Sequence, residues 1–132
     1  MIKLIKPYFL VFALFFIFGC TVNGFNDLKP GDVCSIENDS TSFGVMKILA
    51  IEDSIFHIKI YRNKYSQRPE QTEVSELTIE PDTTNLNFGI PHLALTKNSF
   101  SKWKPKFIQN ENVTEDEITF LNIWKTKQIN NK

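Results

Sequence analysis

The strongest hydrophobic pattern in the chain is a pair of adjacent segments, residues 43–51 and 55–61. The first is almost entirely apolar or small, which is typical of a buried strand. The second alternates between apolar and polar residues, which is typical of a strand with one face in the core. The short polar break at residues 52–54 joins the two segments, and we expect a β-hairpin at the centre of the fold. In the second strand, one face carries Phe56, Ile58 and Ile60 and the other carries His57, Lys59 and Tyr61.

Weaker patterns on both sides of this hairpin predict further strands. Pro30, Gly31 and Asp32 precede an expected strand over residues 33–37, and a polar turn follows it. Residues 74–79 predict another strand, and residues 106–109 predict a short one. Residues 88–93 are apolar and contain a glycine and a proline, so we expect a turn that packs against the sheet.

Two helices are expected near the C-terminus. Thr96 can cap a short helix that reaches about Trp103. Thr114 and Glu117 have the spacing of a capping box, which starts a longer helix over about residues 115–128. We expect this helix to pack on the sheet through an apolar stripe of Ile118, Leu121 and Trp124, widened by Phe120 and Ile123.

This order of elements, with strands first and helices last, predicts an α+β fold. We expect a small antiparallel sheet or an SH3-like barrel, with strands at about residues 32–79, followed by C-terminal helices, the last at about 115–128. The Gly-Asp-Val opening, the Phe-Gly-Val start of the next strand and the long hairpin loosely resemble small SH3-like barrels. The body suggests no particular family, and residues 30–132 are expected to form a single small globular domain.

The N-terminus carries a different signal. Lys3 and Lys6 precede an unbroken apolar run over residues 8–18, which ends at Gly19 and Cys20. These are the proportions of a secretory signal peptide, whose apolar region spans about 7–15 residues. A transmembrane helix needs about 20 apolar residues, and a core helix would carry a polar stripe that this run lacks. We therefore expect residues 1–19 to export the protein.

The end of this run, Ile17-Phe18-Gly19-Cys20, resembles the lipobox of bacterial lipoproteins, although Phe18 stands where that family usually has a small residue. The resemblance implies cleavage between Gly19 and Cys20, a diacylglycerol on the Cys20 thiol and usually an acylated amine. These chains would hold Cys20 in a lipid bilayer, since each buried methylene contributes about 0.8 kcal/mol. Residues 20–29 would then form a tether. The alternative is a plain signal peptide and a free product.

The resemblance implies the cell envelope as the location. Thr21 rather than Asp follows the cysteine, so the inner-membrane retention signal of enteric lipoproteins is missing. In a host with two membranes the resemblance therefore implies the outer membrane, facing the periplasm. Charge changes this picture little. The chain has 15 basic and 15 acidic residues, and loss of Lys3 and Lys6 leaves a slight acidic excess, which does not favour a nucleic-acid partner.

Candidate catalytic residues are sparse. Cys34 is a lone thiol if Cys20 is lipidated, and otherwise a Cys20–Cys34 disulfide is conceivable in an oxidising envelope. Cys34 with His57 or His92 would be needed for a cysteine hydrolase, but no surrounding motif supports such a nucleophile. The histidines lack the spacing of a metal site. We expect no catalytic residue, no cofactor and no metal.

Two surfaces suggest binding. A basic and aromatic segment over residues 61–68, with a similar cluster at 102–104, could contact an anionic partner. Residues 70–82 carry several acidic side chains and no lysine or arginine, and could contact a basic partner. The residues of the expected basic surface are Tyr61, Arg62, Lys64, Tyr65, Arg68, Lys102, Trp103 and Lys104.

Three functions are compatible with these features. The first, which we prefer, is a non-enzymatic envelope lipoprotein that binds another envelope protein or a cell-wall polymer. The second is an immunity-type lipoprotein that neutralises a toxin through the acidic span. The third is an envelope hydrolase that uses Cys34 and a histidine.

Overall fold

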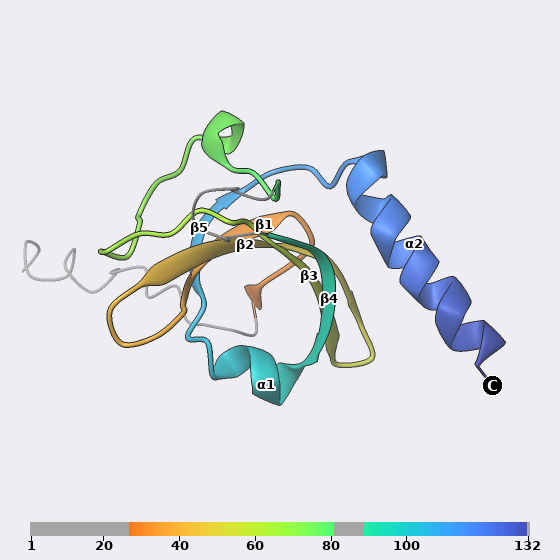
Figure 1. The fold of residues 1–132 in the computed structure, drawn as a ribbon. Coiled ribbons are helices and arrows are strands. Elements are labelled where there is room, and N and C mark those ends of the chain that lie inside the picture. Colours follow the sequence, from red (N-terminus) through yellow and green to blue (C-terminus); the bar gives the residue numbers. More distant parts are fainter. Residues whose placement is uncertain (1–26, 81–88, 132) are drawn as a thin grey trace, which may run out of the picture.

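The computed structural model describes residues 27–80 and 89–131, and its centre is a five-stranded sheet with antiparallel neighbours in the order β4-β3-β2-β1-β5 (Figure 1). The predicted α+β fold with a small antiparallel sheet is therefore confirmed, and the sheet is open and not closed into a barrel. The strands are β1 (Asp32–Glu37), β2 (Phe43–Glu52), β3 (Ile55–Ile60), β4 (Ile90–Thr96) and β5 (Lys106–Asn110). The helices are η4 (Val74–Glu76), α1 (Lys97–Ser101) and α2 (Glu115–Asn130).

The predicted central hairpin is formed by β2 and β3. Lys47 lies opposite Lys59 in its register, and Glu52 lies opposite Ile55. Asp53 and Ser54 form the connection with positive φ angles of 50° and 67°. Two consecutive residues with positive φ are the mark of a type I′ turn, whose twist matches that of the strands it joins.

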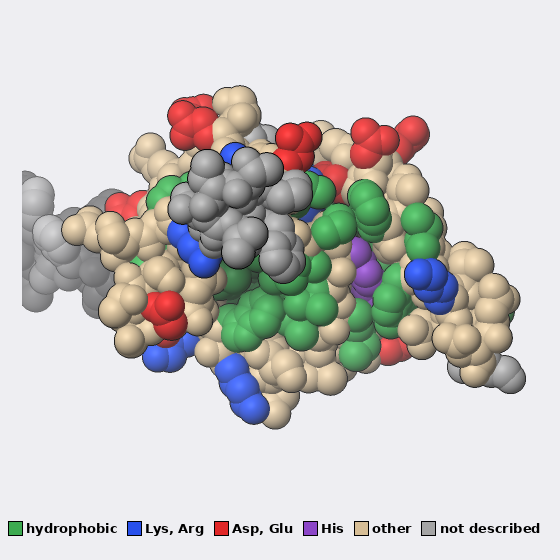
Figure 2. Space-filling model, in the orientation of Figure 1, with side chains coloured by type: hydrophobic (Ala, Val, Ile, Leu, Met, Phe, Trp, Pro, Cys, Tyr) green, Lys and Arg blue, Asp and Glu red, His purple; other side chains and the backbone are tan. Residues whose placement is uncertain are grey.

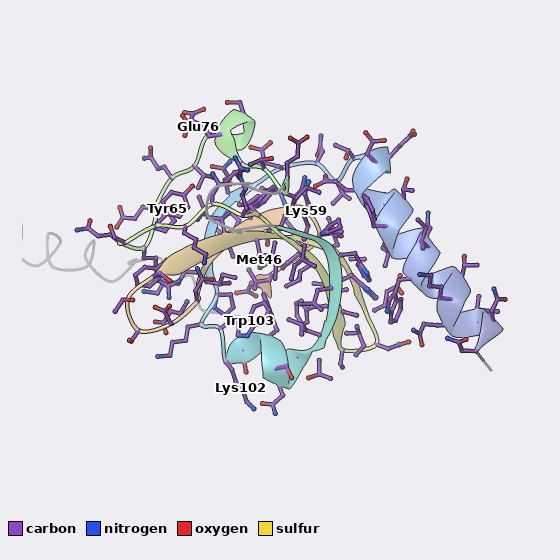
Figure 3. All side chains as sticks on the ribbon, in the orientation of Figure 1. Met46, Lys59, Tyr65, Glu76, Lys102 and Trp103 are labelled. Atoms are coloured by element: carbon purple, nitrogen blue, oxygen red, sulfur yellow. The ribbon has the colours of Figure 1, made fainter. Side chains whose placement is uncertain are left out.

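The inner face of the sheet holds the main core. Met46, Ile48 and Ile58 are fully buried there, and α1 covers them through Phe100 (Figures 1 and 3). The ring centroids of Phe100 and Phe56 lie 4.8 Å apart in a stacked arrangement. Thr96 caps α1 as predicted, since its hydroxyl accepts the backbone N–H of Ser99.

The outer face is also covered, contrary to the half-buried strand that we predicted for residues 55–61. His57 is 1% exposed and Tyr61 is 7% exposed, because α2 and residues 77–79 pack over this face. Leu77 and Ile79 contact a second cluster of buried residues formed by Val33, Val45 and Tyr61. The alternation was read correctly, but both faces of β3 lie in the interior.

The strand predicted over residues 74–79 is wrong. The chain makes a 3₁₀ turn at Val74–Glu76 and then crosses the outer face, held by a hydrogen bond from the Arg62 N–H to the Thr78 carbonyl. The Ile79 carbonyl accepts the N–H of Gly89 at 3.1 Å. A Cβ atom at Gly89 would lie 2.6 Å from the Ile60 carbonyl oxygen and the Ile79 Cα, so this close approach requires glycine.

The sheet extends beyond the range of residues 32–79 in which we expected its strands. Strand β4 replaces the turn expected at residues 88–93, of which residue 88 lies outside the described residues. Pro91 cannot donate to a ladder, but β4 is an edge strand and tolerates it. The short strand expected at residues 106–109 is present as β5.

Helix α2 begins with the predicted capping box. The Thr114 hydroxyl accepts the Glu117 N–H, and the Glu117 carboxylate accepts the Thr114 N–H. Of the expected stripe, Leu121 is buried and Trp124 contacts the sheet, whereas Ile118, Phe120 and Ile123 are 37%, 44% and 48% exposed. The apolar face of α2 is therefore narrower than predicted.

Candidate functional site

An ion cluster fixes the first turns of α2 to the outer face of the sheet. Glu117 Oε1 lies 2.8 Å from Lys47 Nζ, and Glu117 Oε2 lies 3.1 Å from Lys59 Nζ. Lys47 Nζ also donates to the carbonyl of Asn112 at 2.7 Å. Burial would raise the pKa of Glu117, but hydrogen bonds from Lys47, the Thr114 N–H and Lys59 outweigh it and lower this pKa to about 2. Glu117 is therefore a structural carboxylate, committed to its two lysines.

Two histidines meet under the C-terminal half of α2. His57 Nδ1 and His92 Nε2 lie 2.9 Å apart, and the rings stack with centroids at 5.2 Å. Trp124 contacts both histidine rings, and its ring centroid lies 5.0 Å from that of His57 and 5.7 Å from that of His92. Our sequence interpretation placed the histidines in different elements and missed this pair. The outward position of His57 on β3 was a usable signal, but its partner depends on the β3–β4 pairing.

Acidic side chains gather at the end of the molecule where α2 begins. Figure 2 shows them along one edge, over η4 and the start of α2. Neighbouring residues agree with this placement, since Asp116 and Ile79 line a common pocket. The negative charge of Glu111 helps to raise the pKa of Tyr61, and that of Glu76 helps to raise the pKa of Tyr65. We call this surface the acidic edge, formed by Glu73, Glu76, Glu80, Glu111, Glu115 and Asp116.

A small apolar pocket adjoins the acidic edge. It has a volume of about 110 Å³. Phe120 lies on its helical side at 44% exposure, and the Lys59–Glu117 ion pair lies within its lining. The apolar walls suit the aliphatic stem of a lysine or arginine side chain, and the exposed carboxylate of Asp116 suits its charged head. The pocket is lined by Lys59, Ile79, Pro91, Asp116, Glu117 and Phe120.

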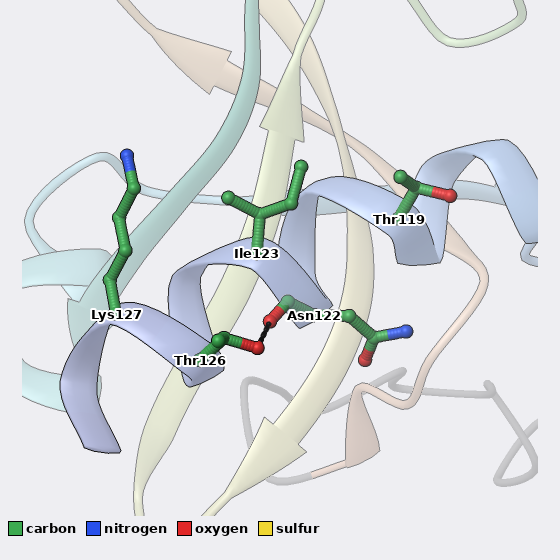
Figure 4. A pocket seen from close by; sticks show the side chains of 5 residues that line it. All are labelled: Thr119, Asn122, Ile123, Thr126 and Lys127. Atoms are coloured by element: carbon green, nitrogen blue, oxygen red, sulfur yellow. Dashed lines mark hydrogen bonds between the residues drawn. The ribbon is translucent and has the colours of Figure 1, made fainter. Parts of the chain in front are cut away.

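A second, open hollow lies on the surface of α2 and gives no indication of a ligand. Figure 4 shows Ile123 and Lys127 along it, with the Thr126 hydroxyl bonded to the Asn122 carbonyl at 2.9 Å. All of its lining residues, which include Thr119, belong to one helix. This hollow is the surface relief between neighbouring side chains, and we assign it no site.

Residues 61–68 form the first half of the predicted basic surface, and most of their named side chains make contacts within the fold. Tyr61 is buried under residues 77–79, and Tyr65 packs beside it. Arg62 donates to the Glu80 carbonyl at 2.9 Å. Arg68 donates to the Ser35 hydroxyl and lies over the Phe43 ring. Lys64 is exposed.

The second half of that surface lies elsewhere. Lys102 and Lys104 are exposed after α1, while Trp103 packs against the inner core (Figure 3). One link joins the two halves: Arg68 donates to the Lys104 carbonyl at 3.1 Å, and both cations approach Glu37. The structure therefore does not bring the eight predicted residues together as one basic face.

Cys34 lies in the inner core, fully buried. Burial, followed by the charge of Asp32, raises its pKa to about 12, so the thiolate is strongly disfavoured. His57 points to the opposite face of the sheet, where it contacts Trp124. Within residues 27–80 and 89–131, no three His, Cys, Asp or Glu side chains gather in a way that could hold a metal ion.

Comparison of the chain with family models, curated proteins and solved structures finds no match. In the described part of the chain, no helix combines the length and the apolar character needed to cross a membrane. The predicted cleavage and lipidation positions, Gly19 and Cys20, lie outside the described residues. Lipid anchoring stays a prediction from the sequence.

Proposed function

We propose that the protein is a membrane-anchored envelope lipoprotein that binds a basic protein partner at its acidic edge and catalyses no reaction. The observation that carries the binding proposal is the apolar pocket at Phe120 beside the exposed carboxylates of Glu115 and Asp116. The lipobox-like end of the N-terminal run, at Cys20, supports the anchor.

Charge favours a protein over a cell-wall polymer as the partner. Many wall polymers are polyanions, which the acidic edge would repel, whereas lysines and arginines would be attracted to it. The alternative basic surface is weakened because Tyr61 and Arg68 are engaged inside the fold. An exposed aromatic residue beside a pocket is also a common anchor of protein interfaces.

Neutralisation of a toxin is the second candidate, and the same edge favours it. An immunity protein needs a surface that is complementary to a charged site on its toxin, and a concentrated acidic surface speeds association with a basic partner. The hydrolase hypothesis has no comparable support, because Cys34 is buried on the face opposite His57.

Selection from a random peptide display library against the full-length protein in detergent micelles tests the proposal. We expect enriched peptides that place Lys or Arg next to an apolar residue, and binding that weakens as salt rises. Enrichment of acidic peptides, or of no sequence class, would overturn the proposal.

Matched variants locate the binding surface. Phe120→Ala should weaken binding of an enriched peptide by about tenfold or more, as expected for an interface anchor, whereas Phe107→Ala should leave it unchanged. Phe107 is a suitable control because it is 48% exposed but lies on β5, at the other edge of the sheet. Likewise, Asp116→Asn should weaken binding and Asp53→Asn, in the β2–β3 turn, should not. Equal effects within each pair would place the site elsewhere.

A further inference from the structure

The His57–His92 pair lies where the C-terminal half of α2 meets the sheet. Their facing nitrogens are 2.9 Å apart, so one ring must donate a hydrogen and the other must accept it. A single added proton is compatible with this contact. Two added protons are not, because both facing nitrogens would then carry hydrogen and neither could accept.

The surroundings offer the pair little compensation for positive charge. Glu52 on β2 has Oε2 at 3.9 Å from His57 Nε2, but its Oε1 pairs with Lys125 of α2 at 2.6 Å. Among the described residues, further charges on this side of β2, β3 and α2 come from Lys47, Lys59 and Glu117, which neutralise part of one another in the ion cluster.

Burial lowers the pKa of His57, and the charge of Lys125 adds to this effect while that of Glu52 opposes it. Burial also lowers the pKa of His92, as does the charge of His57. Because a lowered histidine pKa makes the folded state bind fewer protons than the unfolded state, the interface loses stability as pH falls below the ordinary value of 6.5.

The attachment of α2 to the sheet depends on few side chains. Glu117 and Leu121 are its buried residues, and Trp124 reaches the histidine pair. Since the pKa of Glu117 is about 2, the ion cluster at the N-terminal end keeps its charge at pH 5. Mild acid therefore acts selectively on the C-terminal half of the helix.

We propose that the stacked His57–His92 pair is a pH-operated latch, which holds Trp124 and the C-terminal half of α2 on the sheet when neutral and releases them when both rings are protonated. Release would let the helix pivot at Glu117 and move Phe120 away from Pro91. As a regulator of partner binding, this latch rests on the proposed function of the acidic edge. The opening of α2 itself does not.

Amide hydrogen exchange of the full-length protein in detergent micelles tests the latch without any partner. After correction for intrinsic rates, residues 121–130 should exchange at least tenfold faster at pH 5.0 than at pH 7.5. In a Trp103→Phe background, where Trp124 is the remaining tryptophan, its emission should shift to longer wavelength over the same range. Unchanged exchange and emission between these pH values would overturn the proposal.

The variants His57→Gln and His92→Gln provide the control, because glutamine can donate and accept hydrogen bonds but does not titrate in this range. Each should abolish most of the pH dependence. If both variants open with pH as the wild type does, the pair is not the latch. If neither variant folds, an NMR titration of the wild-type histidines tests the latch instead. If both rings are protonated at pH 5 while the amides of residues 121–130 remain protected from exchange, the latch is refuted.

Peptide binding at two pH values separates the two proposals. An enriched basic peptide should bind at pH 7.5 and at least fivefold more weakly at pH 5.0 in the wild type, with a smaller change in His92→Gln. Absence of binding at pH 7.5 would contradict the acidic edge while the exchange data still test the latch. Equal binding at both pH values, together with an opened helix, would contradict only its regulatory role.

Discussion

Replacement of Glu117 by glutamine is the sharpest perturbation of the α2–sheet interface. Glutamine keeps an oxygen that can accept the Thr114 N–H, so the capping box can persist. The substitution removes the charge that compensates Lys47 and Lys59, whose side chains are 5% and 18% exposed. It therefore isolates the electrostatic contribution of the ion cluster from that of the helix cap.

The lowered pKa of Glu117 gives the size of the expected loss in the free energy of unfolding. The pKa of Glu117 falls from 4.5 to about 2, and each pKa unit corresponds to about 1.4 kcal/mol. The stabilisation is fully present above pH 4.5 and is lost as pH falls through the folded-state pKa, so Glu117→Gln should cost about 3 kcal/mol at pH 7 and roughly half of that at pH 3. Removal of one partner from a buried ion pair typically costs about 3–5 kcal/mol, which agrees.

Urea unfolding of wild type and variant at both pH values measures this difference. Glu115→Gln is the matched control, since it removes an exposed carboxylate from the same helical turn and should cost only about 0.3–1 kcal/mol through the helix dipole. A loss below about 1 kcal/mol at pH 7, or the same loss at pH 7 and pH 3, would refute the electrostatic account.

Three further predictions concern the rest of the fold. Phe100→Ala should lower the free energy of unfolding by about 3–5 kcal/mol, because the ring is fully buried against Phe56; a urea midpoint near that of the wild type would contradict this. Ser54→Gly should raise thermal stability by up to about 1 kcal/mol, because Ser54 has a φ of 67°, and calorimetry would detect the opposite sign if the turn were not strained. Cys34 should resist iodoacetamide at pH 8 until urea unfolds the chain, as peptide mass mapping can test; rapid labelling of the native protein would show that the thiol is accessible.

The sequence predicted the features whose signals are local. The β2–β3 hairpin follows from the alternation in residues 55–61 and the adjoining polar break. The Thr96 cap follows from a threonine at the expected start of α1, and the Thr114 cap follows from its three-residue spacing to Glu117. Each signal lies within a few residues of its partner. Long-range packing therefore did not override these predictions.

Features set by long-range packing were missed. Strand β4 was hidden by Pro91, which an edge position tolerates. Residues 76–79 alternate between polar and apolar like a strand, but residues 74–79 make a 3₁₀ turn and cross the sheet without joining its ladder. Period-two alternation along β3 shows that the strand has an apolar and a polar face. It does not show that α2 packs over the polar face. The burial of Tyr61 and the His57–His92 contact both depend on that coverage.

The central claim, that this domain acts from a membrane, is tested most directly by the intact mass and membrane fractionation of the mature protein beside a Cys20→Ala variant. We predict a wild-type mass of residues 20–132 plus a diacylglycerol, with or without an amide-linked acyl chain, in the membrane fraction, and loss of the acyl groups in the variant. An unmodified chain in the soluble fraction, or a chain that still carries residues 1–19, would contradict the lipid anchor and would reopen a Cys20–Cys34 disulfide.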